Sequence, residues 1–466
     1  MPSLLGFYHA LPTSLRTVAA TARGYQLQRW RYSSETDQLV ASALDRDYWT
    51  QAQWDSWQAE RLASMLRRAA TNVPYYRGQW DERRRKGDGV SPDVLGNWPI
   101  LRKEALRQGP RMFLADDVQI HTMHSEHTSG TTGTPIRIWS SRDTASAWYG
   151  LFEARWRRWY GITRHDRWAN LGGQVVVPVA RCRPPFWVWN AAMHQLYMSS
   201  YHLAVDLIPY YLDALERYEV KYILGYTSSL YALALAARKR KRGFHVALVL
   251  TNAEPLHVHQ RELISDVFQC PVRETYGMSE MVVAASECEA GRLHLWPEAG
   301  VVEILDWQSD HPVPPGTTGR IVASGLLNSD MPLVRYETGD SGALDPDQTP
   351  CVCGRSLPRL LCVEGRCDDT LKTLDGRRVG RLDAVFKASM RVREAQIVQE
   401  SLNRVVVRVV PLDGYSQADE VLIAARLRER VGNMEVEFEK LDSIPREKNG
   451  KFRAVVNHTG NKSGCG

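Results

Sequence analysis

HTSGTTGTP, at residues 127–135, places one serine, four threonines and two glycines in a short stretch that ends in a proline. Gly130 and Gly133 permit the positive φ angles and the close backbone approach that a phosphate cradle requires. The hydroxyls and amides therefore predict a polyphosphate-binding loop, formed by Thr128, Ser129, Gly130, Thr131, Thr132 and Gly133. A Ser/Thr/Gly surface turn without a ligand is the alternative interpretation. The spacing and lysine of a Walker A loop are missing, which argues against the usual NTPase and kinase folds.

The composition is that of an ordinary globular protein, with 44% hydrophobic and 24% charged residues among 466. This length predicts roughly two to four domains. A net charge of +6, from 59 basic and 53 acidic residues, suits an anionic substrate and argues against a dedicated nucleic-acid binder. No apolar run reaches the ~20 residues of a bilayer span, and a signal-peptide layout is missing, so we expect a cytoplasmic protein without a transmembrane segment. A membrane-surface location of the amphipathic residues 1–30 is the alternative.

The spacing of apolar residues divides the rest of the chain into regions. Between residues ~140 and ~285, helical stretches alternate with short apolar runs such as VALVL at 246–250, which predicts a largely parallel α/β sheet. TNAEPL at 251–256 follows that run and is expected at the carboxyl edge of the sheet, where α/β proteins bind ligands. After residue 300, short strands and turns predict a β-rich subdomain. Beyond GRCDD at 365–369, two strands, a helix and another strand predict a small α+β domain.

Five motifs occur in order at wide spacing: TSGTTGTP (128–135), ETYGMSE (274–280), VRYETGD (334–340), GRCDD (365–369) and PREKNGKFR (445–453). Together they resemble the signature of the adenylate-forming superfamily of acyl-CoA synthetases and nonribosomal adenylation domains. In particular, the chain resembles the phenylacetate–CoA ligase family and its CapK-like branch, which is associated with capsule and exopolysaccharide biosynthesis. The resemblance implies an α/β fold with a large adenylation domain, residues 1–365, of parallel α/β sheets plus a β-rich subdomain. A small mobile α+β domain, residues 366–466, would follow it.

The resemblance also implies an activity. In this family a carboxylate attacks the α-phosphate of ATP, which gives an acyl-adenylate and pyrophosphate, and a nucleophile then takes the acyl group. The chain is therefore expected to use ATP and Mg²⁺ and to act on a small carboxylic acid. The acceptor stays open between CoA and an amine or hydroxyl, because TLKTLDGRRVG keeps Gly376 of the loop that helps position CoA but not its usual neighbours. A catalytically degenerate nucleotide-binding or assembly protein is the alternative, and the acid and the oligomeric state are not predicted.

Several residues receive roles from this resemblance. Tyr276, beside Gly277, would stack on adenine, and Ser279 would bind near the α-phosphate. Glu280 would hold Mg²⁺, while Asp340 would accept both ribose hydroxyls. The loop, with Thr131 as a catalytic residue, would hold the β- and γ-phosphates, although Ile136 stands where many members have a lysine. Asn252, Ala253 and Glu254 would border the adenine base, and Arg366 would support the ribose.

Lys451, in NGKFR, matches the lysine that reaches from the small domain to the carboxylate and α-phosphate oxygens in the transition state. Asp368, in GRCDD, matches the hinge about which the small domain swings. Tyr226 and Thr227, in GYTSS, match a stretch that borders the acyl pocket. These four residues complete the implied site.

Eight cysteines are too few for a disulfide-dense scaffold, and in a reducing compartment clustered cysteines favour a metal. Cys288 and His294 flank the turn CEAGRLH, and Cys351 and Cys353 form a C-x-C pair. Three thiolates and one imidazole suit a tetrahedral structural zinc without an open position. The open alternatives are ordinary reduced cysteines and a set formed by Cys351, Cys353, Cys362 and Cys367.

Overall fold

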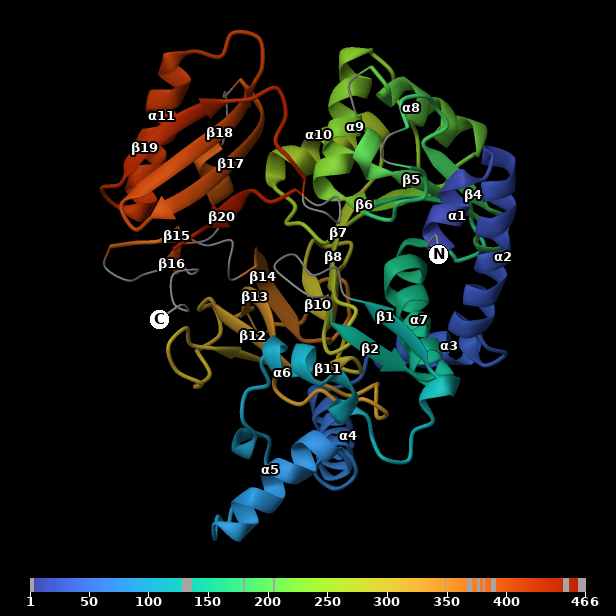
Figure 1. The fold of residues 1–466 in the computed structure, drawn as a ribbon, viewed down its shortest axis with the longest axis vertical. Helices are drawn as coiled ribbons and strands as arrows, with labels where there is room; N and C mark the ends of the chain where they lie inside the picture. Colours follow the sequence, from blue (N-terminus) through green and yellow to red (C-terminus); the bar gives the residue numbers. More distant parts are fainter. Residues whose placement is uncertain are drawn as a thin grey trace.

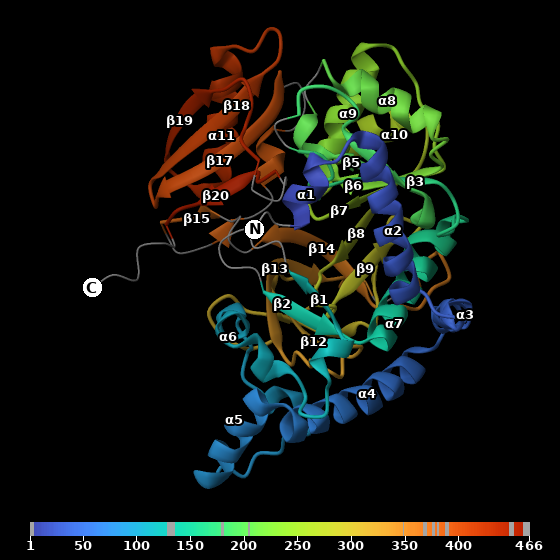
Figure 2. The ribbon, with the colours of Figure 1, turned by 45° about the vertical axis from the view of Figure 1, so that its right-hand side comes forward.

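The computed structural model describes residues 4–127, 136–178, 181–203, 206–347, 349–366, 371–374, 378–379, 382–386, 391–446 and 452–459. Helices at the amino-terminal end are α1 (Leu4–Ala10), α2 (Thr13–Arg31), α3 (Thr36–Arg46), α4 (Gln51–Asn72), α5 (Pro74–Arg85) and α6 (Lys103–Gln108). Thr50 starts α4 with a capping box in which its side chain accepts from the Gln53 amide. Figures 1 and 2 both show α4 and α5 at one end of the molecule, away from the C-terminal part of the chain.

The expected parallel sheet is present in the middle of the chain. It contains β3 (Trp168–Gly172), β4 (Trp187–Asn190), β5 (Gln195–Ser199), β6 (Tyr222–Tyr226), β7 (Leu248–Asn252) and β8 (Val272–Gly277). The strand order β8-β7-β6-β3-β5 is parallel throughout, and β4 closes the edge as an antiparallel strand. One face packs on α8 (Ile208–Arg217), α9 (Thr227–Lys239) and α10 (Val258–Phe268), and the other on α3 and α7 (Arg142–Phe152).

The expected β-rich part is an antiparallel continuation of the same sheet. Its strands are β9 (Ala284–Glu287), β10 (Leu293–Leu295), β11 (Gly300–Leu305), β12 (Gly319–Gly325), β13 (Tyr336–Leu344) and β14 (Arg359–Arg366). Together the strands form one twelve-stranded sheet in the order β11-β12-β13-β14-β10-β9-β8-β7-β6-β3-β5-β4. The antiparallel region begins at Ala284, earlier than residue 300, where the change in sequence pattern is visible.

Strand β8 joins the two halves because its two ends have different partners. Its first residues pair in parallel with β7, as in Thr251 opposite Glu274. Its last residues pair antiparallel with β9, as in Tyr276 opposite Ala285. The ETYGMSE motif thus begins at the point where the sheet changes from parallel to antiparallel.

The C-terminal unit has a sheet and a core of its own (Figure 1). It contains β17 (Val392–Ser401), β18 (Arg404–Pro411), α11 (Gln417–Val431), β19 (Glu435–Lys440) and β20 (Val455–Asn457), with the strand order β19-β18-β17-β20. The expected order of two strands, a helix and a strand is confirmed, and β20 is added. Two small hairpins complete the fold, β1 (His124–His127) with β2 (Arg137–Ser140), and β15 (Leu371–Lys372) with β16 (Arg378–Val379). Within the described ranges, no helix is long and apolar enough to cross a membrane.

Candidate functional site

A cleft of about 2530 Å³ lies at the carboxyl ends of β7 and β8, between the large sheet and the C-terminal unit. Asn252, Tyr276 and Asp340 line it from the large sheet, and Arg446 and Phe452 line it from the C-terminal unit. Polar residues at this edge follow from the topology, since parallel strands bring their carboxyl ends to one side of a sheet. The cleft therefore gathers three of the sequence motifs.

Two of the expected nucleotide contacts touch each other. The Tyr276 hydroxyl donates to Oδ2 of Asp340 over 2.9 Å, although the two residues are far apart in sequence. Asn252, at the end of β7, contributes a buried side-chain oxygen that meets no hydrogen-bond donor in the described part of the chain. A buried acceptor without a donor is costly, so this oxygen suits a ligand that brings an N–H group. Ala253 follows with a φ of 64°, which turns the chain at the cleft wall.

Glu280 lines the same cleft and is 8% exposed. One of its oxygens accepts a hydrogen bond of 2.7 Å from the Tyr336 hydroxyl, which fixes the carboxylate against β13. Ser279 and Gly277 also line the cleft. A carboxylate held in this way beside a polyphosphate has the chemistry of a Mg²⁺ ligand.

Glu254 connects the two sides of the cleft. Its Oε2 accepts from the Ser228 amide over 2.7 Å, and its Oε1 accepts from the Ser228 hydroxyl over 3.0 Å and from the Phe452 amide over 2.8 Å. Ser228 lies in the first turn of α9, where the helix dipole favours a negative charge. Burial raises the pKa of Glu254, and the Ser228 and Phe452 amides oppose that rise.

Other expected site residues fall outside the described residues: Thr128, Ser129, Gly130, Thr131, Thr132, Gly133, Asp368 and Lys451. Their roles stay predictions. Glu126 and Ile136, which flank the predicted phosphate loop, line the cleft. For Arg366 the structure describes only the backbone, which pairs with Asp340 across β13 and β14. That pairing brings the two expected ribose residues to neighbouring strands.

Tyr226 and Thr227 lie next to the cleft, but neither is among the residues that line it. Thr227 is 1% exposed, and its hydroxyl donates to the Glu254 carbonyl over 3.1 Å. Leu224 and Ser228, from the same segment, do line the cleft. Contact of Tyr226 and Thr227 with substrate stays a prediction.

Sequence reasoning missed Glu274, which opens the ETYGMSE motif and lines the cleft. Burial, with repulsion from the nearby Glu287 carboxylate, raises its pKa to about 7. Its amide donates to Oε2 of Glu287 over 2.7 Å, and Arg261 donates to the same oxygen over 3.0 Å. The available signal was a carboxylate at the first position of the ETYGMSE motif, within strand β8.

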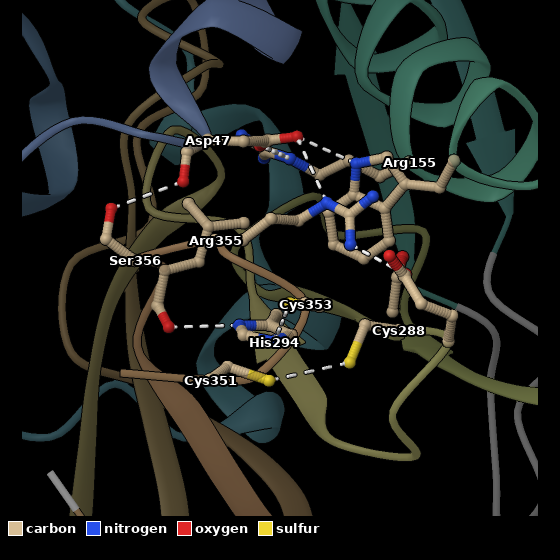
Figure 3. A network of polar contacts seen from close by, with 12 residues as sticks. Asp47, Arg155, Cys288, His294, Cys351, Cys353, Arg355 and Ser356 are labelled. Atoms are coloured by element: carbon tan, nitrogen blue, oxygen red, sulfur yellow. Dashed lines mark hydrogen bonds and ion pairs between the residues drawn. The ribbon is translucent and has the colours of Figure 1, made fainter. Parts of the chain in front are cut away.

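A second group of residues, Cys288, His294, Cys351 and Cys353, forms a cysteine–histidine cluster around the end of β9 and strand β10 (Figure 3). All four ligand atoms lie within 4.8 Å of one another. Cys288 Sγ and Cys351 Sγ are 3.8 Å apart, and Cys353 Sγ lies 3.5 Å from His294 Nε2. Zn–S bonds of ~2.3 Å in a tetrahedron place sulfur atoms about 3.8 Å apart, so the spacing fits zinc.

The protonation of His294 and the hydrogen bond at its other ring nitrogen also fit a metal. His294 Nδ1 lies 3.1 Å from the Leu357 carbonyl oxygen, so donation there leaves Nε2 free to ligate. Burial lowers the pKa of His294 to about 4, which keeps the ring neutral. In the alternative set, Cys362 belongs to β14 and Cys367 lies outside the described residues. Among the described residues, the metal-ligand geometry selects the first set.

A buried ionic network lies beside this cluster (Figure 3). Arg155, in the π-helical turn η4 (Glu153–Arg157), pairs with Glu298 over 2.7 Å and with Asp47 over 2.9 Å. Asp47 also accepts from Trp159 Nε1 over 2.7 Å, and its carbonyl accepts from the Ser356 amide over 2.9 Å. The network ties the end of α3 to the turn that carries Cys351 and Cys353.

Comparison with known families gives two matches. Residues 121–329 match the AMP-binding enzyme family, and residues 371–458 match the CapK C-terminal domain. Protein CapK of Staphylococcus aureus is 24% identical over 412 residues, which cover 86% of this chain and 88% of the relative. A phenylacetate-coenzyme A ligase of Thermus thermophilus is 26% identical over 458 residues, which cover 86% of this chain and 95% of the relative.

Among solved structures, a 2-hydroxyisobutyryl-CoA ligase in the postadenylation state, in complex with R3-HIB-AMP, is similar with a TM-score of 0.69. It is 21% identical, and the similarity covers 89% of this chain and 92% of that chain. This likeness confirms the expected fold class, a large α/β domain followed by a small C-terminal domain.

Proposed function

We propose that this chain, which belongs to the adenylate-forming superfamily and to the CapK-like branch of its phenylacetate–CoA ligase family, activates a carboxylic acid with ATP. The acid carboxylate attacks the α-phosphorus, a P–O bond to the acid forms, and the bond to pyrophosphate breaks. The products are an acyl-adenylate and pyrophosphate. The observation that carries the proposal is the contact between Tyr276 and Asp340 at a cleft also lined by Asn252 and Glu280.

In this proposal, different described residues bind different parts of ATP. Tyr276 presents its ring to the adenine, and Asp340 accepts the ribose hydroxyls with the carboxylate that Tyr276 orients. Asn252 offers to an N–H group of the base its side-chain oxygen, which meets no donor among the described residues. Glu280, fixed by Tyr336, would hold a Mg²⁺ ion, which screens the phosphate charge when bound. The phosphate loop at 128–133 and Lys451 complete the proposed machinery.

We further propose that the acyl group passes to CoA. The names of the phenylacetate-coenzyme A ligase relatives support this acceptor, because the chain shares most of its length with one of them. An amine or hydroxyl acceptor remains the second candidate, since the CoA-loop region around Gly376 departs from the usual residues. We also propose a role in polysaccharide or natural-product biosynthesis, which the resemblance to the CapK-like branch implies.

The decisive experiment measures pyrophosphate release with ATP and Mg²⁺ against a panel of aryl, acyl and amino acids. The proposal expects release with at least one acid and formation of the matching acyl-CoA when CoA is added. Release without an acyl-CoA product would move the acceptor to an amine or hydroxyl. A protein that releases pyrophosphate with none of the acids would instead be the degenerate binding relative.

For the cysteine–histidine cluster we propose one structural zinc ion per chain. Cys288, His294, Cys351 and Cys353 fill a tetrahedral shell, so the ion would have no open position for catalysis. Elemental analysis of the purified protein should find zinc, and Cys351→Ser should lose it. Cys182→Ser is the matched control, because Cys182 is exposed and stands outside the cluster. Protein that contains no zinc, or a Cys351→Ser variant that keeps it, would contradict this site.

A further inference from the structure

The Glu254 carboxylate links two parts of the chain that are 198 residues apart. On one side it is anchored to α9, where Ser228 donates from both its amide and its hydroxyl. On the other side it accepts from the Phe452 amide over 2.8 Å. The same buried carboxyl group thus serves donors from both sides, and without it the Phe452 amide would lose this acceptor, so the contact is a direct link across the cleft.

The segment that Glu254 holds is itself fixed to the C-terminal sheet. Gln396 Nε2 donates to the Arg453 carbonyl over 2.8 Å, and the Ile397 amide donates to the Ala454 carbonyl over 2.8 Å. Both donors belong to β17. A contact at Phe452 therefore helps to position the C-terminal unit, because residues 453 and 454 are hydrogen-bonded to its strand β17.

Arg446 shapes the surroundings of this contact. Its guanidinium lies 4.6 Å from the centre of the Phe452 ring and pairs with Glu394 over 2.6 Å. It is also the positive charge that acts on the Glu254 carboxylate. The carboxylate thus faces an amide and a cation from the C-terminal unit and faces Ser228 from its own side. The arrangement favours a docked unit as long as Glu254 accepts hydrogen bonds.

We propose that Glu254 is a positioning residue that docks the C-terminal unit on the cleft by holding the amide of Phe452. Phe452 follows Lys451 directly in the sequence, so fixing this amide constrains the chain next to the proposed catalytic lysine. The inference rests on the proposed adenylation for its catalytic consequence. The docking itself is independent of any substrate.

The test compares Glu254→Ala and Glu254→Gln with Ser228→Ala in the full chain. Hydrogen–deuterium exchange of the Phe452 amide, without substrate, should accelerate on the order of tenfold or more in Glu254→Ala. Glu254→Gln should lie between Glu254→Ala and the natural protein, because an NH2 group replaces one of the two accepting oxygens and cannot accept from the amide that faces it, that of Ser228 or that of Phe452. Ser228→Ala keeps both backbone donors and should retain the slow exchange. Unchanged exchange in Glu254→Ala would overturn the docking role.

A second readout separates positioning from nucleotide binding. With an acid that supports turnover, Glu254→Gln should lower kcat for pyrophosphate release on the order of tenfold, with the KM for ATP nearly unchanged. A raised KM with an unchanged kcat would instead assign Glu254 to the nucleotide site and overturn the inference. If no acid supports turnover, the proposed function fails, but the exchange measurement still decides the docking role.

Discussion

Replacing Glu298 by alanine should destabilise the large domain strongly, because it removes one partner of a buried ion pair. The Arg155 side chain is fully buried, and Glu298 binds it through two bonds of 2.7 and 3.1 Å. Without Glu298, the guanidinium keeps Asp47 as its carboxylate partner at 2.9 Å, while Arg46 loses its bond of 3.0 Å to Glu298. Removing one partner of a buried ion pair costs roughly 3–5 kcal/mol, and the bond that Asp47 keeps to Arg155 places the expected loss near the lower end of that range.

Asp117→Ala is the matched control. Asp117 binds Arg68 through two bonds of 3.1 and 2.8 Å, almost the geometry of the buried pair, but its side chain is 56% exposed. Exposed pairs contribute about 0.2–1 kcal/mol, so the control should shift the unfolding midpoint only slightly. Thermal and urea unfolding of both variants in the same buffer give the comparison. Equal midpoint shifts would refute the reasoning, because they would mean that burial of the pair has no energetic consequence.

Three further changes test the site. Asp340→Ala should raise the KM for ATP about tenfold or more in the pyrophosphate assay, because the ribose loses its acceptor, and an unchanged KM would remove Asp340 from the nucleotide site. Removing the proposed zinc with a chelator should lower the thermal midpoint of the natural protein, whereas a Cys351→Ser variant should not respond. Glu274→Gln should stabilise the protein most at about pH 8 and least at about pH 5. The Glu274 pKa rises from 4.5 unfolded to about 7 folded, so the folded state binds the extra proton and loses stability as the pH rises between these values. This loss of unfolding free energy in the natural protein is at most about 3 kcal/mol. A difference in unfolding midpoint between Glu274→Gln and the natural protein that does not vary with pH would contradict it.

The sequence predicts those site residues that lie within short, recognisable motifs. Tyr276, Glu280 and Asp340 sit in short motifs, and their placement in one cleft agrees with what those motifs imply. The two halves of the cysteine–histidine cluster are likewise visible as a Cys/His pair and a C-x-C pair. Pairing of His294 with Arg359, across β10 and β14, then brings these pairs together.

Contacts between distant segments could not be predicted in this way. Glu254 meets Phe452 because the C-terminal unit lies over the cleft, and nothing near either residue indicates this partner. Arg155 contacts Asp47 and Glu298, and the three residues come from separate parts of the chain. The sequence around Arg155 therefore does not distinguish this buried arginine from its neighbours. Glu274 gains its raised pKa from Glu287 on the neighbouring strand, which a single motif cannot reveal.

Strand β8 connects the cleft with the cysteine–histidine cluster. Its parallel half brings Glu274 to the carboxyl edge of the sheet, and its antiparallel half pairs with β9. Glu287, in β9, accepts from the Glu274 amide, and Cys288 follows it directly in the chain. A metal that fixes Cys288 therefore fixes the end of β9 against the strand that carries Tyr276. The cluster lies outside the cleft, but its loss should loosen the backbone on which the adenosine contacts are built.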